Sequence, residues 1–255
     1  MAAFVQLRFV NLSDDEGMSN VVFFQKNTTA IHDNRVAWRV VRHCEHHDYC
    51  SIPYSLDTDI NMVDWNANHS ERLTAYQGNV FHIAPQGYGK YLSAMPLEGC
   101  PTQIWVQNHL SQGAVHVNLY RSGCLVAQQR NVIPEQWAKF DLLHWLYVAV
   151  MPDVKQGEII PSRFLSTSVA EFCLYDIVSA DIIMLGGGCG KDAVALHFEI
   201  TNVVWRQLSC PVHINYSGRF WLKNGLLFLS QVKLHILAQP EHPFCSNLNT
   251  YSETS

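Results

Sequence analysis

The stretch Ala114-Val115-His116-Val117-Asn118-Leu119-Tyr120-Arg121-Ser122-Gly123-Cys124-Leu125-Val126-Ala127 decides the fold class. Apolar and polar residues alternate through its first half, which is typical of a β-strand with one buried face. Ser122-Gly123 are turn residues, and the apolar run after them predicts the second strand of a hairpin. Another strand pattern covers 103–108, and Ser111-Gln112-Gly113 favours a turn after it. We therefore expect a three-stranded meander from about 103 to 129.

The same period continues on both sides of this stretch. Val36, Trp38 and Val40 alternate with neighbours that point the other way. The polar stretch 55–75 is predicted to be a long surface loop. No segment has a capped 3.6-residue stripe of helical length, which argues against βαβ folds. The sequence predicts an all-β antiparallel β-sandwich of mostly short strands with Gly, Pro and Asn turns; further strands are expected at 21–26, 35–41, 136–141, 144–150, 169–178, 179–185 and 194–204.

The chain carries few charges for its size. Charged residues make up 15% of its 255 residues, against about 25% in an average soluble domain. The formal net charge is −5 and the isoelectric point about 6.2, which argues against nucleic acid as a partner. Sparse charge on strands favours a homo-oligomer, because edge strands and apolar faces need covering.

The start of the chain predicts a cytoplasmic protein. Residues 1–8 lack the basic and apolar regions of a signal peptide. No run of about 18 apolar residues predicts a transmembrane segment. The 8 Cys are widely spread and form no C-x-x-C pair, so we expect reduced thiols.

Three groups of residues together resemble a known family. They are Ser19–Asn27 with Val36–Val40, then Val106–Asn108, Gly113–Val115 and Tyr120–Gly123, and finally Ser179–Gly188 with Gly190–Asp192. They resemble an uncharacterised family of small soluble β proteins in bacteria and fungi, some of which carry an automated label of aromatic ring-opening dioxygenase. The resemblance covers about residues 7–205 and implies a β fold. No catalytic motif accompanies the label, so it implies no site residues.

After Trp205 the chain departs from that pattern. We therefore expect a β-sandwich domain over 1–205 and an atypical C-terminal extension over 206–255. The extension is apolar around Phe220–Leu222 and Leu226–Leu229, which is consistent with an extra hairpin. Its polar end, 247–255, is predicted to be frayed.

The densest cluster of metal-ligand residue types is His43-Cys44-Glu45-His46-His47-Asp48-Tyr49-Cys50. Imidazole and thiolate are ligands of zinc and other borderline metals. The candidate ligands are His43, Cys44, His46, His47 and Cys50, with His46 and either His43 or Cys50 converging on one Zn or Fe ion. The spacing matches no standard zinc finger, and a polar loop of exposed histidines is the alternative. A non-haem iron site would need two His and one carboxylate facing inward.

Other motifs carry less chemistry. The run Gly186–Asp192 fails as a phosphate loop, because Leu185 stands where the first glycine belongs and Asp192 where Ser or Thr belongs. A glycine-rich hairpin is the better interpretation. Cys124, Cys173 and Cys189 are open candidates for a Cys/His pair, although nothing selects one. No G-x-S-x-G or H-E-x-x-H motif occurs.

Most of the 7 Trp lie in strand patterns and are expected to fill the core. Trp65 differs, because it lies among Asp and Asn residues. An exposed ring there would stack on a sugar or anchor a partner. The alternative is a ring that pins its loop onto the sandwich.

These observations favour a non-enzymatic protein that acts in binding, self-assembly or accumulation as a structural protein, with no cofactor. The first alternative is a metal-dependent oxygenase that uses the cluster at 43–50. The second is a lectin-like or membrane-active sandwich with Trp65 as a contact. The ligand in the binding hypotheses is a small molecule or a glycan that the sequence does not identify.

Overall fold

The computed structural model of the chain divides into two compact units, residues 1–206 and residues 207–255. It describes residues 4–15, 19–29, 35–87, 89–164, 169–189, 191, 193–206, 213–214, 220–222 and 225–227. In the second unit it describes a three-stranded antiparallel sheet of β17 (His213–Ile214), β18 (Phe220–Leu222) and β19 (Gly225–Leu227). The expected frayed end at 247–255 lies outside the described residues.

The described residues of the first unit form four sheets of four strands each. Sheet I has the order β16 (Val194–Trp205), β15 (Ile177–Gly187), β1 (Phe4–Asn11), β4 (Tyr49–Ser55), and sheet II the order β14 (Ala170–Cys173), β13 (Trp145–Val150), β2 (Val21–Phe24), β3 (Ala37–Val41). Sheet III has the order β11 (Cys124–Val132), β10 (Val115–Arg121), β5 (Thr58–Val63), β6 (Leu73–Ala75), and sheet IV the order β12 (Trp137–Phe140), β9 (Ile104–Asn108), β7 (Asn79–Gln86), β8 (Gly89–Glu98). One 3₁₀ turn, Ser162–Phe164, completes the described elements of this unit.

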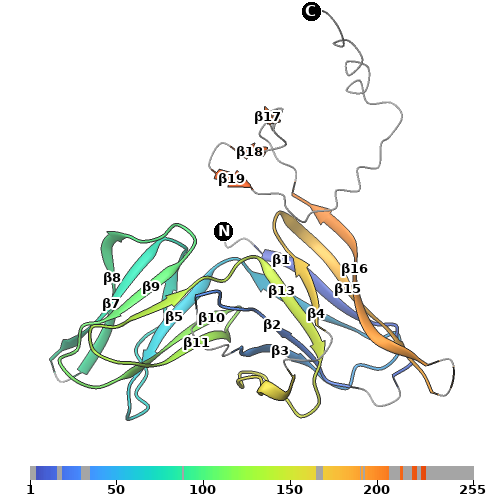
Figure 1. Cartoon of the computed structure of the whole chain (residues 1–255), viewed down its shortest axis with the longest axis horizontal. Helices are drawn as coiled ribbons and strands as arrows, with labels where there is room; N and C mark the ends of the chain where they lie inside the picture. Colours follow the sequence, from blue (N-terminus) through green and yellow to red (C-terminus); the bar gives the residue numbers. More distant parts are fainter. Residues whose placement is uncertain are drawn as a thin grey trace, which may run out of the picture. The chain divides into compact units, whose positions relative to one another are not determined.

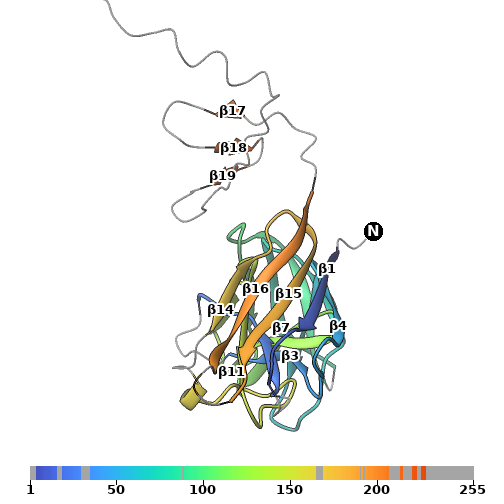
Figure 2. The same ribbon diagram turned by 90° about the vertical axis from the view of Figure 1, so that its right-hand side faces the viewer.

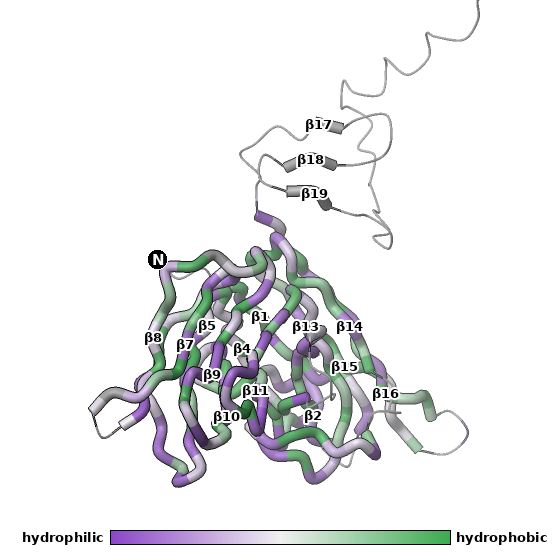
Figure 3. The backbone as a smooth tube through the Cα atoms, turned by 60° about the vertical axis from the view of Figure 1, so that its left-hand side comes forward, coloured by the Kyte–Doolittle hydropathy of each residue, from purple (hydrophilic) through white to green (hydrophobic). Residues whose placement is uncertain are grey.

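The four sheets form two sandwiches. Sheets I and II make the first sandwich, and sheets III and IV make the second, which lies at the left of Figure 1. Figure 2 views the first sandwich with β16, β15 and β1 in front. Hydrophobic and hydrophilic residues are interleaved along the chain in Figure 3, as expected for strands with one buried face. The prediction of an all-β sandwich is confirmed.

The two sandwiches have the same topology and exchange strands. The half-chain β1–β8 has the same pairing roles as the half-chain β9–β16, so that β1 next to β15 corresponds to β9 next to β7. These two pairs are the parallel ones, and all other pairs are antiparallel. Strands β1–β4 complete a sandwich with β13–β16, while β5–β8 complete the other with β9–β12. Each sandwich therefore needs strands from both halves of the chain.

Two buried asparagines mark equivalent places in the two halves. Asn11 and Asn108 each end a strand, and each accepts a backbone N–H two residues further on, at 2.9 and 3.0 Å. Their side-chain amides donate to the carbonyl oxygens of Cys44 and Val132. Their own carbonyls accept from His47 and Glu135, which both have left-handed backbone conformations. The repeat is therefore one of hydrogen bonds and topology rather than of sequence.

One expected connection is wrong. The meander from 103 to 129 does not form, because β9 pairs with β7 and β12 while β10 pairs with β5 and β11. The turn at 111–113 carries the chain from sheet IV to sheet III. The Asn108 amide holds this crossing by donating to the carbonyls of Gly113 and Val132. The hairpin of β10 and β11 forms as predicted, around Ser122-Gly123.

The expected surface loop at 55–75 is also wrong, because it contains β5 and β6. Ile60 and Met62 of β5 belong to the core. Two of its polar residues are buried as well: Thr58 is 5% exposed and Asn61 2%, and the Asn61 amide faces the His69 ring. These buried polar residues made a core strand look like a loop.

Cutting the chain between the halves tests the strand exchange. We expect that a protease site inserted between Gly99 and Gln103, cleaved after folding, leaves two fragments that co-elute and melt in one transition, because each sandwich contains strands of both. Size-exclusion chromatography and circular dichroism measure this, with the same cleaved sample in denaturant as the control. Fragments that separate without denaturant would contradict the strand exchange.

Candidate functional site

A cavity of about 310 Å³ lies in the second sandwich, beside the segments that connect it to the first. Its inner wall is apolar and comes from both sheets, with Ile104, Leu119 and Phe140 all buried. The polar residues of its lining are Thr58, Thr102, Tyr76, Gln77, Arg121 and His144. A cavity with an apolar wall and a small number of polar groups is typical of small-molecule sites.

Arg121 is the most unusual group in this cavity. It is the last residue of β10, where alternation places it on the same buried face as Val115, Val117 and Leu119. The residue is 5% exposed. No ion pair links it to a carboxylate among the described residues. A buried charge without a counterion carries a penalty of several kcal/mol.

The hydrogen bonds of the Arg121 guanidinium are incomplete. Nη1 donates to the carbonyl of Ser55 at 2.6 Å and lies 3.5 Å from that of Leu56. Nε is buried and has no hydrogen-bond partner. The Tyr54 ring supports the group, since its centre lies 4.5 Å from Cζ. Arg121 thus carries a charge and a buried N–H group without a partner, and the residue lines the cavity.

Burial lowers the pKa of Arg121, while Tyr54 and Asp57 oppose this shift. Arginine nevertheless stays protonated in proteins. Asp57 acts only from beyond ion-pair distance, so it does not neutralise the charge. The cavity therefore holds a positive charge at neutral pH.

The first sandwich provides an internal comparison for this cavity. Gln25 corresponds to Arg121, because its amide donates to the carbonyl of Leu143 just as Arg121 donates to that of Ser55. Tyr54 corresponds to Leu142, because β4 and β12 begin at the equivalent Tyr49 and Trp137.

The corresponding space in the first sandwich is smaller, and Gln25 is not among the residues that line it. The Gln25 amide also donates to the Tyr54 hydroxyl and to the Trp145 carbonyl, and Tyr54 is fully buried. The cavity left at this end has about 160 Å³, and Leu56 and His144 line both cavities. The fold therefore does not require an arginine or an open space at this position.

His144 is the second ionisable group of the cavity. Burial lowers the pKa of its imidazole, the charge of Arg121 lowers it further, and Asp176 raises it. Its ring packs against Tyr175, with centres 5.7 Å apart. His144 is therefore neutral at pH 7 and is placed to respond to any charge that enters beside Arg121.

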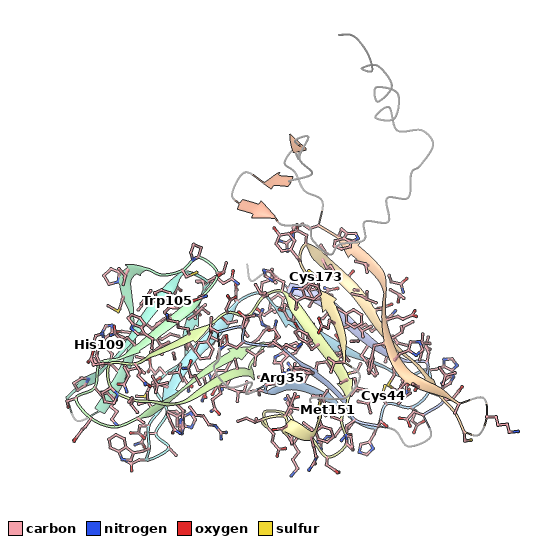
Figure 4. All side chains as sticks on the ribbon, in the orientation of Figure 1. Arg35, Cys44, Trp105, His109, Met151 and Cys173 are labelled. Atoms are coloured by element: carbon pink, nitrogen blue, oxygen red, sulfur yellow. The ribbon has the colours of Figure 1, made fainter. Side chains whose placement is uncertain are left out.

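Four of the predicted metal ligands lie in the segment that joins β3 to β4, and Cys50 is the second residue of β4. Figure 4 labels Cys44 there, in the first sandwich. His46 Nδ1 lies 2.8 Å from the carbonyl of Ser13, and the His46 and His47 rings are 3.9 Å apart. His43, His46 and His47 are exposed, whereas Cys44 and Cys50 are half-buried.

These side chains do not gather into one ligand set. Within the described residues, no group of three or more His, Cys, Asp or Glu is placed to hold a metal ion. Burial raises the pKa of the Cys44 thiol, aided by Asp48 and Cys50, which disfavours the thiolate that binds metals. A metal site at 43–50 remains a prediction. Metal analysis beside a His46→Ala variant tests it.

Trp65 lies in the turn after β5 and is 58% exposed. Lys90 Nζ lies 3.2 Å from the centre of its ring, and Nζ also pairs with Asp64 at 3.3 Å. The ring rests on Gly113, where a Cβ would lie 2.1 Å from a ring carbon. Trp65 therefore fixes its turn to neighbouring segments and still exposes part of the ring.

Of the other tryptophans, Trp38 is fully buried and donates to the Arg121 carbonyl, while Trp205 is 60% exposed and so does not fill the core. The glycine run from Gly186 begins the connection from β15 to β16, as the hairpin interpretation predicted. Gly187 lies so close to Asp14 that a Cβ would clash with its backbone, and Gly188 donates to the Asp14 carbonyl.

Sequence reasoning missed Arg121 and His144. The signal for Arg121 was present, since the alternation of β10 places this arginine on the core face with Leu119. Nothing in the sequence marked His144.

In the described residues no helix is long and apolar enough to cross a membrane. No family model, curated protein or solved structure matches this chain.

Proposed function

We propose that the protein is a non-enzymatic binding protein for a small organic anion with an apolar body. The observation that carries this proposal is the buried Arg121, which has no carboxylate partner among the described residues and lines a cavity of about 310 Å³. A carboxylate at this point supplies the missing counterion and accepts charge-assisted hydrogen bonds. The apolar wall takes the body of the ligand, and Thr58 or Thr102 offers a hydroxyl beside it.

The internal comparison supports the same proposal. Gln25 and Tyr54 fill the equivalent place in the first sandwich with neutral groups, and the Gln25 amide donates to the Tyr54 hydroxyl. A protein that needed only stability at this position would gain from the same pair in the second sandwich, because buried charges cost more than buried amides. Arg121 and Leu142 instead leave a charge and a space.

We propose that the protein acts in the cytoplasm. The cysteines that the structure describes are all free thiols, which suits a reducing compartment. The metal-dependent oxygenase and the Trp65-based lectin stay alternatives. Neither the segment at 43–50 nor the turn with Trp65 holds a buried charge without a counterion among its described residues, as the cavity does at Arg121.

A panel of monocarboxylates tests the proposal, with benzoate, phenylacetate, hexanoate and octanoate as probes and their carboxamides as uncharged controls. We expect at least one carboxylate to bind in calorimetry and to raise the melting temperature. Arg121→Gln, which copies Gln25, should weaken binding about tenfold or more, since a charge-assisted hydrogen bond contributes about 1.5–3 kcal/mol. Leu142→Tyr, which copies Tyr54, should abolish binding by filling the space.

Arg72→Gln is the matched control, because it removes an exposed arginine outside the cavity. It should bind the carboxylate as the unchanged chain does. Equal binding of carboxylates and carboxamides would contradict the proposal, as would full binding by a folded Arg121→Gln protein.

The affinity should also depend on pH through His144. Its pKa in the free chain is lowered by burial and by Arg121. A bound anion offsets the Arg121 charge and raises this pKa, so binding takes up protons and tightens as the pH falls from 8 toward the pKa of the free imidazole. Calorimetry across this range, with a ligand whose own pKa is about 4, measures the effect. His144→Gln should remove it, and an unchanged slope in that variant would contradict the role of His144.

Self-assembly is a further proposal, supported by β16. Among the described strands β16 pairs only with β15, and it exposes Val194, Val204 and Trp205. A long open edge with apolar side chains favours pairing with a second copy. Sedimentation at rising concentration should show dimers or larger species that Trp205→Glu weakens. A strict monomer at high concentration would contradict this expectation.

A further inference from the structure

A second concave site lies on the outer face of sheet I, on the opposite side of the sheet from the core. It is a groove of about 550 Å³. All four strands of the sheet contribute to it, and most of its lining residues are polar, including Arg8, Tyr49, Ser51, Asp181 and Asn202. The neighbouring residues of β1 that point inward belong to the core, so the two faces of the sheet are chemically separate.

An ion pair forms the floor of this groove. The parallel register of β1 and β15 places Arg8 opposite Asp181. Arg8 Nε donates to Oδ1 at 2.9 Å and Nη2 donates to Oδ2 at 2.6 Å. This bidentate geometry fixes both side chains, and it leaves N–H groups of Arg8 unused.

Asn202 completes the floor from β16. Its amide donates to Asp181 Oδ2 at 2.7 Å. Asn202 has a left-handed backbone with φ of 50°, close to a register shift between β15 and β16. Such irregularities re-aim a side chain relative to a regular strand. Hydrogen bonds from Arg8 lower the pKa of Asp181, although burial opposes the shift, so the carboxylate stays ionised.

Tyr49 forms the rim of the groove. It is the first residue of β4 and is 71% exposed. Arg8 Cζ lies 5.7 Å from the centre of its ring. An exposed ring beside fixed donors and acceptors offers an apolar face next to a polar floor.

The second sandwich has the same topology without the Arg8, Asp181 and Tyr49 side chains, so the fold does not require them. The register of β9 and β7 places Trp105 opposite Val80 where β1 and β15 have Arg8 and Asp181. Trp137 takes the place of Tyr49. The ion pair is absent from that place, and the two Trp rings pack together with centres 5.7 Å apart.

From this arrangement we infer that the outer face of sheet I binds a carbohydrate. Sugar hydroxyls both donate and accept hydrogen bonds, so vicinal hydroxyls pair with the free N–H groups of Arg8 and with the oxygens of Asp181 and Ser51. The C–H face of the same ring packs on Tyr49. This site is independent of the anion cavity and of Trp65, which lies in the other sandwich.

A glycan array of neutral and acidic oligosaccharides, followed by calorimetry with the strongest glycan, tests the inference. We expect binding that Tyr49→Ala reduces tenfold or more and that Tyr49→Phe largely keeps, because the ring face is the contact. Asp181→Asn should reduce binding as well. Trp65→Ala, which removes an exposed ring outside the groove, should bind as the unchanged chain does, and melting curves confirm that each variant folds.

Two results would overturn the inference. One is an array on which the folded chain binds no glycan. The other is binding that Trp65→Ala removes and that Tyr49→Ala leaves intact, which would assign the sugar contact to the turn after β5. Neither result affects the carboxylate measurements on Arg121, so the two proposals fail separately.

Discussion

The parallel pairing of β1 with β15, and of β7 with β9, is the constraint on which the rest of the first unit depends. Each pairing joins strands from different halves of the chain and thereby closes one sandwich. The segments that follow β4 and β12 must then cross from one sandwich to the other, and they carry Leu56 and His144. The cavity lined by Arg121 lies at this crossing, so its position follows from the strand exchange.

Because the two sandwiches have the same topology, equivalent positions in them can be compared directly. Where the two halves agree, as at Asn11 and Asn108, the residues maintain the fold by satisfying backbone groups. Where they differ, as at Gln25 and Arg121, the fold tolerates either residue and another requirement decides. The same comparison separates Arg8 and Asp181 from Trp105 and Val80 on the outer faces. Both proposed sites are places where one sandwich departs from the other.

The sequence predicted strands better than sheets. Alternation along 103–150 and 177–205 is regular, so the strands there agree closely with the structure. Pairing depends on contacts between distant segments, which is why β9 and β10 were wrongly joined into one meander. The strand at 58–63 was missed because Asn61 and the neighbouring Asp64 are polar residues that the fold buries. The cavity at Arg121 was missed because the sequence does not show which side chains surround this arginine. Its lack of a carboxylate partner among the described residues is seen only in the structure.

The central claim is that the Arg121 guanidinium is an unneutralised donor that awaits an anion. Nuclear magnetic resonance of its Nε–H group tests this most directly, with the signal assigned as the one that Arg121→Gln removes. Titration with a carboxylate should shift this signal downfield as a hydrogen bond forms, while the matching carboxamide should leave it in place. A signal that no carboxylate moves at millimolar concentration would contradict the account.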